Sequence, residues 1–343
     1  MYHSSTQRKY WTFKNDSEIS KAREQVNRVY RQCYVEKSPE RDINDDSFFL
    51  TVNEERQLLR WYDDKLIKEF CRHFNPQIPL TSIGTACQYM KRLYLRYSVM
   101  DYNPKLMMLA AIWLSCKTDE FNISMDQFVW NVHHLLKGEA RDHGEDYARK
   151  YGDAILSIEL ILIKELNFHL TVHNPLRPFE GFIIDVKTRY AGRNIDKIDM
   201  LRKPARDYLY TSFFTDAQLL FTPSQIALAS LLSVGSKQGI NLDAYVTEHL
   251  LKGQPQNVLD DTVKSVKKIR SIIKKCVKPP SESVAMAIEQ KLQFCRNRES
   301  DPLTEEYARV KNQEDEERDR VAAQKWRAEA QRQKQIEMDL LAF

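Results

Sequence analysis

Two stretches of the chain, YNPKLMMLAAIWL at residues 102–114 and FTPSQIALASLLS at residues 221–233, repeat one pattern. Each has a proline at its third position, Pro104 or Pro223, followed by a nearly continuous apolar run. Proline is favoured in the first turn of a helix, and a helix that is apolar on every face is buried on every face. Each stretch is therefore predicted to be the central helix of a helical domain.

The likeness extends outward from these two helices. Upstream, Ala86 matches Ala205 at the same offset that separates the two prolines. Downstream, ISMDQFV from residue 123 matches INLDAYV from residue 240, at an offset two residues shorter. A chance likeness between apolar helices is the alternative, but the proline register and the shared D-x-[YF]-V ending favour a duplicated domain. A repeat this long is a domain and not the unit of a solenoid.

The predicted fold is all-α, with two tandem copies of about five helices flanked by N- and C-terminal helices. Only 9 glycines and 12 prolines occur in 343 residues, which argues against a turn-rich β protein. The expected segments are an N-terminal amphipathic helix and linker (1–50), the first copy (51–170), the second copy (171–278), a C-terminal helix (279–300) and a charged tail, helical or disordered (301–343).

Composition excludes several function classes. The net charge is +4 and is not gathered into one basic block, so direct nucleic-acid binding is not expected. No apolar run is long enough for a membrane span, so no membrane partner is expected. The six scattered cysteines form no C-x-x-C pair, and phosphate-binding, kinase, serine-hydrolase and zinc-protease motifs are absent. We therefore expect no catalytic residue, metal or cofactor, and a function that lies in surfaces.

Two charged residues interrupt the apolar helices of the first copy. Lys117 ends the central helix and is expected to lie too deep to be only a solvated helix end and too near the surface to belong to the core. Glu159 sits within a helix at 145–167 whose apolar residues cover every face, so this helix is expected to be buried all round. An unpaired buried carboxylate is costly, and Glu159 should therefore face a cation or the surface.

The two copies, with LSCKTDEFN at 114–122 and IELILIKELNFHL at 158–170, resemble the cyclin family. In cyclins, the matching lysine and glutamate hydrogen-bond the backbone beside the mobile regulatory helix of a kinase. The resemblance implies this role for Lys117 and Glu159 and a regulatory, non-enzymatic chain. The apolar residues that cyclins place around the contact fall on Leu114, Ile163, Phe168 and Leu170. Thr118 falls on a position that is aromatic in cell-cycle cyclins.

Within the cyclins, ELNFHLTVHNPLRPFEGFIIDVKTRY at 165–190 and FTPSQIAL at 221–228 are similar to the type that partners the kinase activating other cyclin-dependent kinases. This resemblance implies three partners: that kinase, a RING-finger assembly factor and the core of the transcription factor TFIIH. It also implies phosphorylation of kinase activation loops and of the RNA polymerase II C-terminal tail, and a nuclear location.

An aromatic cluster of Tyr10, Trp11 and Phe13 precedes the first long helix. It has two interpretations, a staple that holds the helix to the core or a contact with the small lobe of the kinase. Three other functions stay open for the whole chain: another transcriptional cyclin, a cyclin-fold factor resembling transcription factor IIB, and a peptide-binding scaffold of the retinoblastoma type. The second would need a zinc ribbon and a basic face, which the sequence lacks.

Overall fold

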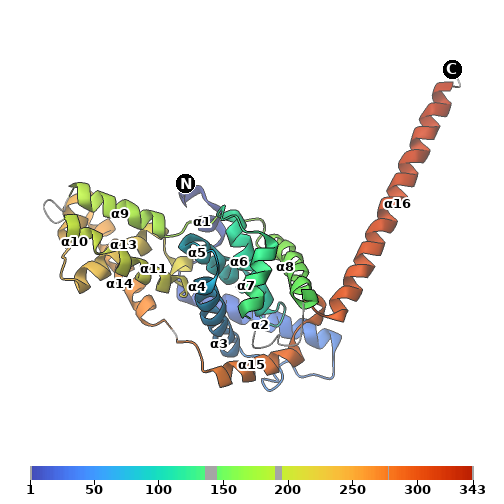
Figure 1. Cartoon of the computed structure of the whole chain (residues 1–343), viewed down its shortest axis with the longest axis horizontal. Helices are drawn as coiled ribbons and strands as arrows, with labels where there is room; N and C mark the ends of the chain where they lie inside the picture. Colours follow the sequence, from blue (N-terminus) through green and yellow to red (C-terminus); the bar gives the residue numbers. More distant parts are fainter. Residues whose placement is uncertain (1, 136–144, 190–194, 277, 342–343) are drawn as a thin grey trace. The chain divides into compact units, whose positions relative to one another are not determined.

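The computed structural model describes residues 2–135, 145–189, 195–276 and 278–341. Every regular element in these residues is helical, which confirms the all-α class (Figure 1). In the same residues, no helix combines the length and apolar character needed to cross a membrane, and no three histidine, cysteine or acidic side chains gather as a metal site requires. The chain divides into two compact units, the second beginning at Asn297.

The first copy is built around its predicted central helix. Its elements are α3 (Val52–Tyr62), the π-helical segment η2 (Asp63–Phe70), α4 (Cys71–His73), α5 (Leu80–Leu93), α6 (Pro104–Thr118), α7 (Met125–Leu135) and α8 (Glu145–Glu165). Asn103 caps α6 by accepting a hydrogen bond from the Lys105 N–H, and Pro104 occupies the first turn. Every side chain from Leu106 to Cys116 is buried, because α5 and α8 pack against α6.

The second copy repeats this plan. Its elements are α9 (Leu176–Arg189), α10 (Ile195–Asp199), α11 (Arg202–Phe213), α12 (Ala217–Leu220), α13 (Pro223–Lys237), the π-helical segment η4 (Tyr245–Leu250) and α14 (Gln256–Lys274). Thr222 and Gln225 form a reciprocal capping box at the start of α13. The α13 helix packs against α9, α11 and α14, so it holds the place that α6 holds in the first copy.

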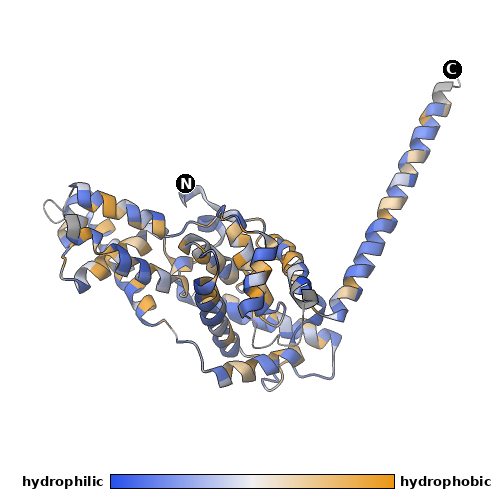
Figure 2. Ribbon diagram, in the orientation of Figure 1, coloured by the Kyte–Doolittle hydropathy of each residue, from blue (hydrophilic) through white to orange (hydrophobic). Residues whose placement is uncertain are grey.

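Further helices flank the copies. In the first unit these are η1 (Tyr2–Ser4), α1 (Thr6–Tyr10), α2 (Asp16–Lys37) and α15 (Glu282–Cys295), and the second unit contains η5 (Arg298–Ser300) and α16 (Glu305–Leu341). The charged tail was expected to be either helical or disordered, and its described part forms the helix α16. It is predominantly hydrophilic (Figure 2), and pairs such as Arg309 with Glu305 and Arg320 with Glu317 link successive turns.

Close contacts join the two copies within the first unit. The Lys91 Nζ of α5 donates to the carbonyl oxygens of Phe213 at 2.6 Å and Thr215 at 2.5 Å, where α11 ends. Gly84 of α5 faces the same junction, since a Cβ there would lie 2.7 Å from the Asn174 side chain and 2.9 Å from the Phe213 ring. A larger residue at this position would require the Asn174 or Phe213 side chain to shift, so glycine allows the close approach. Burial at the junction also lowers the pKa of Lys91.

A buried acid, Glu55, predicts a pH dependence of stability. Its carboxylate accepts hydrogen bonds from Asn27, at 2.8 Å, and from Ser98, yet burial raises its pKa to about 7. The folded state therefore binds this proton more tightly than the unfolded state does. Its stabilising effect is complete at low pH and is lost as the pH rises from the ordinary glutamate range through about 7, by on the order of 2–3 kcal/mol.

The Glu55→Gln variant keeps the shape of the side chain and cannot ionise. We expect its free energy of unfolding to fall less steeply than that of the wild type between pH 5 and pH 8, as measured by urea denaturation. Asp101, whose pKa burial raises to about 6, titrates in both proteins, and its charge helps to raise the pKa of Glu55, so the difference between the two profiles reports Glu55 together with this coupling. Parallel pH profiles would show that Glu55 is not the group responsible.

Candidate functional site

An ion pair joins the end of α6 to the middle of α8. The Lys117 Nζ lies 2.6 Å from Oε1 of Glu159, and the indole Nε1 of Trp113 donates to Oε2 at 3.0 Å. The Glu159 side chain is only 6% exposed, so a buried carboxylate has a donor for each oxygen. The predicted pair therefore forms within the free chain.

Lys117 is the surface-exposed member of this pair. Its side chain is 52% exposed, because the four-carbon stem passes the Trp113 ring and carries the ammonium outward. The Nζ lies 5.7 Å from the ring centroid. An ammonium has three donors, so Lys117 can bind Glu159 and still offer protons to a second molecule.

Trp113 is a site residue that the sequence analysis missed. It lies four residues before Lys117, so the two side chains share one face of α6. It is also buried, and a buried indole N–H needs an acceptor. Together, the spacing and the need for an acceptor were the signal that could have placed Trp113 beside Glu159.

The α8 helix is not buried on every face, and that prediction was wrong. One face packs into the core through Ile155, Ile158 and Leu162. On another, Leu156 is 42% exposed and Leu160 is 71% exposed, at the i, i+4 spacing of one helical face. Hydropathy alone could not distinguish these faces, because both are lined by leucine and isoleucine. An apolar face left exposed beside a fixed ion pair is typical of a protein-binding surface.

The strap, which we define as residues 165–170, continues this surface beyond α8. Asn167 and Phe168 have φ values of 51° and 58°, in the left-handed region that non-glycine residues rarely adopt. Such a conformation costs about 1–3 kcal/mol per residue and persists only where surrounding contacts impose it. Phe168 is also 74% exposed. The chain therefore holds a large aromatic side chain in solvent on a strained backbone.

The contacts that impose this path come from α5 and the turn after it. Their side chains donate to strap carbonyl oxygens at three points: Tyr89 to Leu170 at 2.6 Å, Arg92 to His169 at 2.7 Å and Arg96 to Glu165 at 2.7 Å. Arg92 is fully buried, and burial lowers its pKa to about 10. The strap is thus held by its backbone, which leaves the Phe168 side chain to the surface.

The other predicted residues of this region differ in exposure. Ile163 and Leu170 are partly exposed, and Thr118 is exposed, with its hydroxyl 3.1 Å from that of Tyr89. Leu114 is 2% exposed, so it supports the surface from inside and has no area to offer a partner. The cause is its place in the buried centre of α6, one turn before Lys117.

The N-terminal aromatic cluster packs against the strap. The Trp11 Nε1 donates to Nδ1 of His169 at 3.1 Å, and Phe13 packs with Leu219 of the second copy. Trp11 is 5% exposed, which fits the staple interpretation. Tyr10 is 52% exposed and stacks on the His169 ring with centroids 4.9 Å apart. Of the three, Tyr10 keeps the most area for an external contact.

Comparisons with known families agree with the duplication. Residues 20–171 match the family described as the cyclin N-terminal domain, and residues 174–278 match the cyclin C-terminal domain. A chain in the structure of the CAK complex of Chaetomium thermophilum bound to ATP-gamma-S matches with a TM-score of 0.72 and 24% identity, covering 91% of this chain and 94% of that one. A chain of the yeast TFIIK (Kin28/Ccl1/Tfb3) complex matches with a TM-score of 0.50 and 21% identity, covering 79% and 100%. These likenesses show the fold.

Sequence similarity shows the family. Cyclin-H of Xenopus laevis is 40% identical over 299 residues, which cover 87% of this chain and 88% of the relative. Cyclin-H1-1 of Arabidopsis thaliana is 32% identical over 249 residues, covering 72% and 68%. The chain belongs to the cyclin-H family.

Proposed function

We propose that this chain is the regulatory subunit of a kinase that activates other cyclin-dependent kinases. The observation that carries the proposal is the fixed pair of Lys117 and Glu159 at the edge of an exposed apolar surface formed by Leu156, Leu160 and Phe168. Family membership supports it, as do the similar structures, which are those of a CAK complex and of TFIIK. A factor resembling transcription factor IIB fits this membership poorly.

In this proposal, the surface holds the regulatory helix of the kinase in its active position. Lys117 donates to backbone carbonyl oxygens of the kinase, and Glu159 orients Lys117 by accepting a hydrogen bond from its ammonium. Charge-assisted hydrogen bonds of this kind are strong and directional once water is excluded. Leu160, Ile163 and Phe168 bury their exposed area against the same helix. The helix then brings its glutamate to the catalytic lysine, the ion pair that an active kinase needs.

The remaining partners belong to the same proposal. A RING-finger assembly factor would form the third subunit, and the TFIIH core would bring the complex to RNA polymerase II. The substrates would be kinase activation loops and the polymerase C-terminal tail, and the site of action the nucleus. The chain itself would supply binding surfaces and no catalytic group.

The Lys117→Ala variant tests the contact directly. We expect kinase activation to fall at least tenfold, since a hydrogen bond from a charged donor contributes about 1.5–3 kcal/mol. The readout is phosphorylation of a polymerase-tail peptide after co-expression with the kinase and the assembly factor. The free variant should lose only about 1–2 kcal/mol of stability, because Glu159 keeps Trp113 as a donor and gains access to water.

Lys187→Ala is the matched control. It removes an ion pair of similar length, 2.7 Å to Asp199, from the second copy. We expect activation by this variant to equal that of the wild type. Full activity of Lys117→Ala at unchanged stability would contradict the proposed contact, and a loss matched by Lys187→Ala would trace it to general destabilisation.

A further inference from the structure

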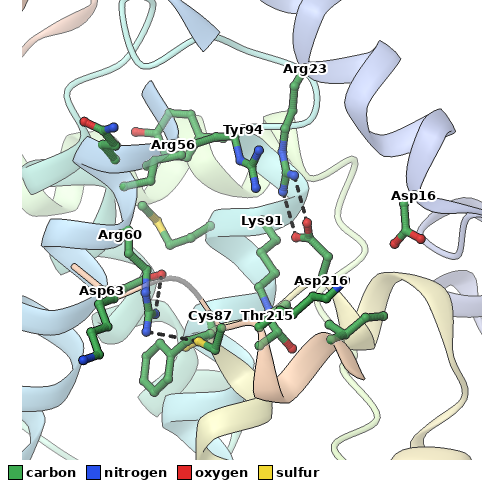
Figure 3. A pocket seen from close by; sticks show the side chains of 18 of the residues that line it. Asp16, Arg23, Arg56, Arg60, Asp63, Cys87, Lys91, Tyr94, Thr215 and Asp216 are labelled. Carbon is green, nitrogen blue, oxygen red and sulfur yellow. Dashed lines mark hydrogen bonds and ion pairs between the residues drawn. The ribbon is translucent and has the colours of Figure 1, made fainter. Parts of the chain in front are cut away.

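A pocket of about 620 Å³ lies at the junction of the two copies, apart from the surface just described (Figure 3). Its walls come from α2, α3 and α5 on one side and from α14 and the turn between α11 and α12 on the other. None of Lys117, Glu159, Leu160 or Phe168 lines it. Its size is that of pockets that bind small molecules or short peptide segments.

The walls of this pocket are strongly basic. Seven lysine and arginine side chains line it against three aspartates. Each aspartate has its own cation: Asp216 is held by Arg23 at 2.8 and 2.9 Å, Asp16 lies 2.9 Å from Lys268, and Asp63 lies 3.7 Å from Arg60. The acidic groups are therefore already neutralised, and the positive charge in excess of theirs is available to a ligand.

Two members of this excess are Arg56 of α3 and Lys275 at the end of α14. Both are exposed, and neither forms an ion pair in the part of the chain that the structure describes. Burial works to raise the pKa of Asp216, but its hydrogen bonds to Arg23 and the charges of Arg23, Lys91 and Arg56 lower it. Arg56 is thus close enough to add to one positive field, and a concave wall concentrates such a field.

We propose that this pocket binds a ligand that carries phosphate groups, displayed on a short peptide segment. A phosphomonoester is close to a dianion at neutral pH and offers three acceptor oxygens, which matches several convergent cations better than a single carboxylate does. The planar guanidinium of Arg56 can bind two phosphate oxygens at once, and Lys275 can add a point charge from the second copy. The volume leaves room for the residues beside the phosphate.

Binding of this kind would bridge the two copies. Arg56 belongs to the first copy and Lys275 to the second, so one phosphate group would draw charge from both. Bringing the phosphate into the pocket replaces repulsion between like charges with attraction. The ligand should therefore raise the melting temperature of the chain as well as bind to it.

The test uses the full chain and a fluorescein-labelled ten-residue peptide with two phosphoserines in a glycine–serine background. The unphosphorylated peptide, a twin with glutamate in place of each phosphoserine, and inorganic pyrophosphate are the comparison probes. Fluorescence anisotropy gives the dissociation constant, and a thermal shift gives the effect on melting. We expect the phosphopeptide to bind at least tenfold more tightly than the glutamate twin, and less tightly as salt increases.

Lys275→Glu and Lys274→Glu form a matched pair. The residues are neighbours and both are exposed, but only Lys275 lines the pocket. We expect at least tenfold weaker phosphopeptide binding for Lys275→Glu and for Arg56→Glu, with little change for Lys274→Glu. Pyrophosphate that binds with the same variant pattern while the peptide does not would support the phosphate site and assign its source to a free phosphate compound.

Several results would overturn the proposal. These are no binding of any phosphate probe, equal binding of the glutamate twin, or equal losses in Lys274→Glu and Lys275→Glu, which would indicate unspecific attraction. Kinase activation by the pocket variants is a separate readout. It should stay at the wild-type level, so the pocket and the proposed kinase surface can fail independently.

Discussion

The Leu160→Asp variant is expected to weaken kinase binding by at least about 100-fold while the free chain stays folded. Leu160 is 71% exposed, so aspartate there costs the isolated fold little. In the complex, the new carboxylate would have to lose its water against an apolar face, next to the negative charge of Glu159. An uncompensated buried charge costs several kcal/mol, and about 2.7 kcal/mol already corresponds to 100-fold in affinity.

Met200→Asp is the control for this variant. Met200 is 70% exposed in the second copy, so the same charge is introduced at the same exposure, away from the proposed surface. Affinities for the purified kinase can be compared by surface plasmon resonance, with circular dichroism as the check on folding. Equal affinities of the two variants would remove α8 from the kinase contact.

The Phe128→Ala variant is expected to lower the free energy of unfolding by about 3–5 kcal/mol, the usual cost of truncating a buried phenylalanine. Phe128 is fully buried. The centroid of its ring lies 5.4 Å from that of Trp113, 5.6 Å from that of Phe74 and 5.9 Å from that of Phe70. Because Trp113 rests on this ring and donates to Glu159, we also expect weaker kinase activation. Urea denaturation measures the first effect.

Tyr245 is the counterpart of Phe128 in the second copy and provides the control. It is also fully buried, and its hydroxyl donates to Asp185 at 2.7 Å. Tyr245→Phe deletes the hydrogen bond to Asp185 and leaves no cavity, so we expect a loss of about 1 kcal/mol. If Phe128→Ala cost no more than Tyr245→Phe, the packing of Phe128 with Phe70, Phe74 and Trp113 would not be part of the stabilising core.

The duplication could be predicted because its signals are local. The register of Pro104 and Pro223 and the apolar runs after them depend only on helix geometry and burial. The pairing of Glu159 with a cation could also be predicted, since an unpaired buried carboxylate is too costly. The exposure of Leu160 and the burial of Leu114 could not be, because both are leucines on apolar helices and only the packing of neighbouring helices separates them.

Two further features depend on contacts between distant segments. The left-handed backbone at Phe168 results from donors on α5, about 80 residues earlier in the chain, and nothing in the strap's own sequence requires it. The basic pocket likewise combines side chains such as Arg56 and Lys275 from the two copies. In the sequence these cations are scattered, and the modest net charge conceals their convergence.

Because α5 and the turn after it hold the strap by its backbone, the surface can diverge in a particular way. Tyr89, Arg92 and Arg96 bind carbonyl oxygens, which every residue type supplies. Substitutions within the strap can therefore change the side chains on this surface without changing the path of the strap backbone. The position of the strap is set by α5 and the turn after it, and the side chains that it displays are set by the strap itself. Under the proposed function, a paralogue could therefore change its choice of kinase by exchanging a few strap side chains while the scaffold stays the same.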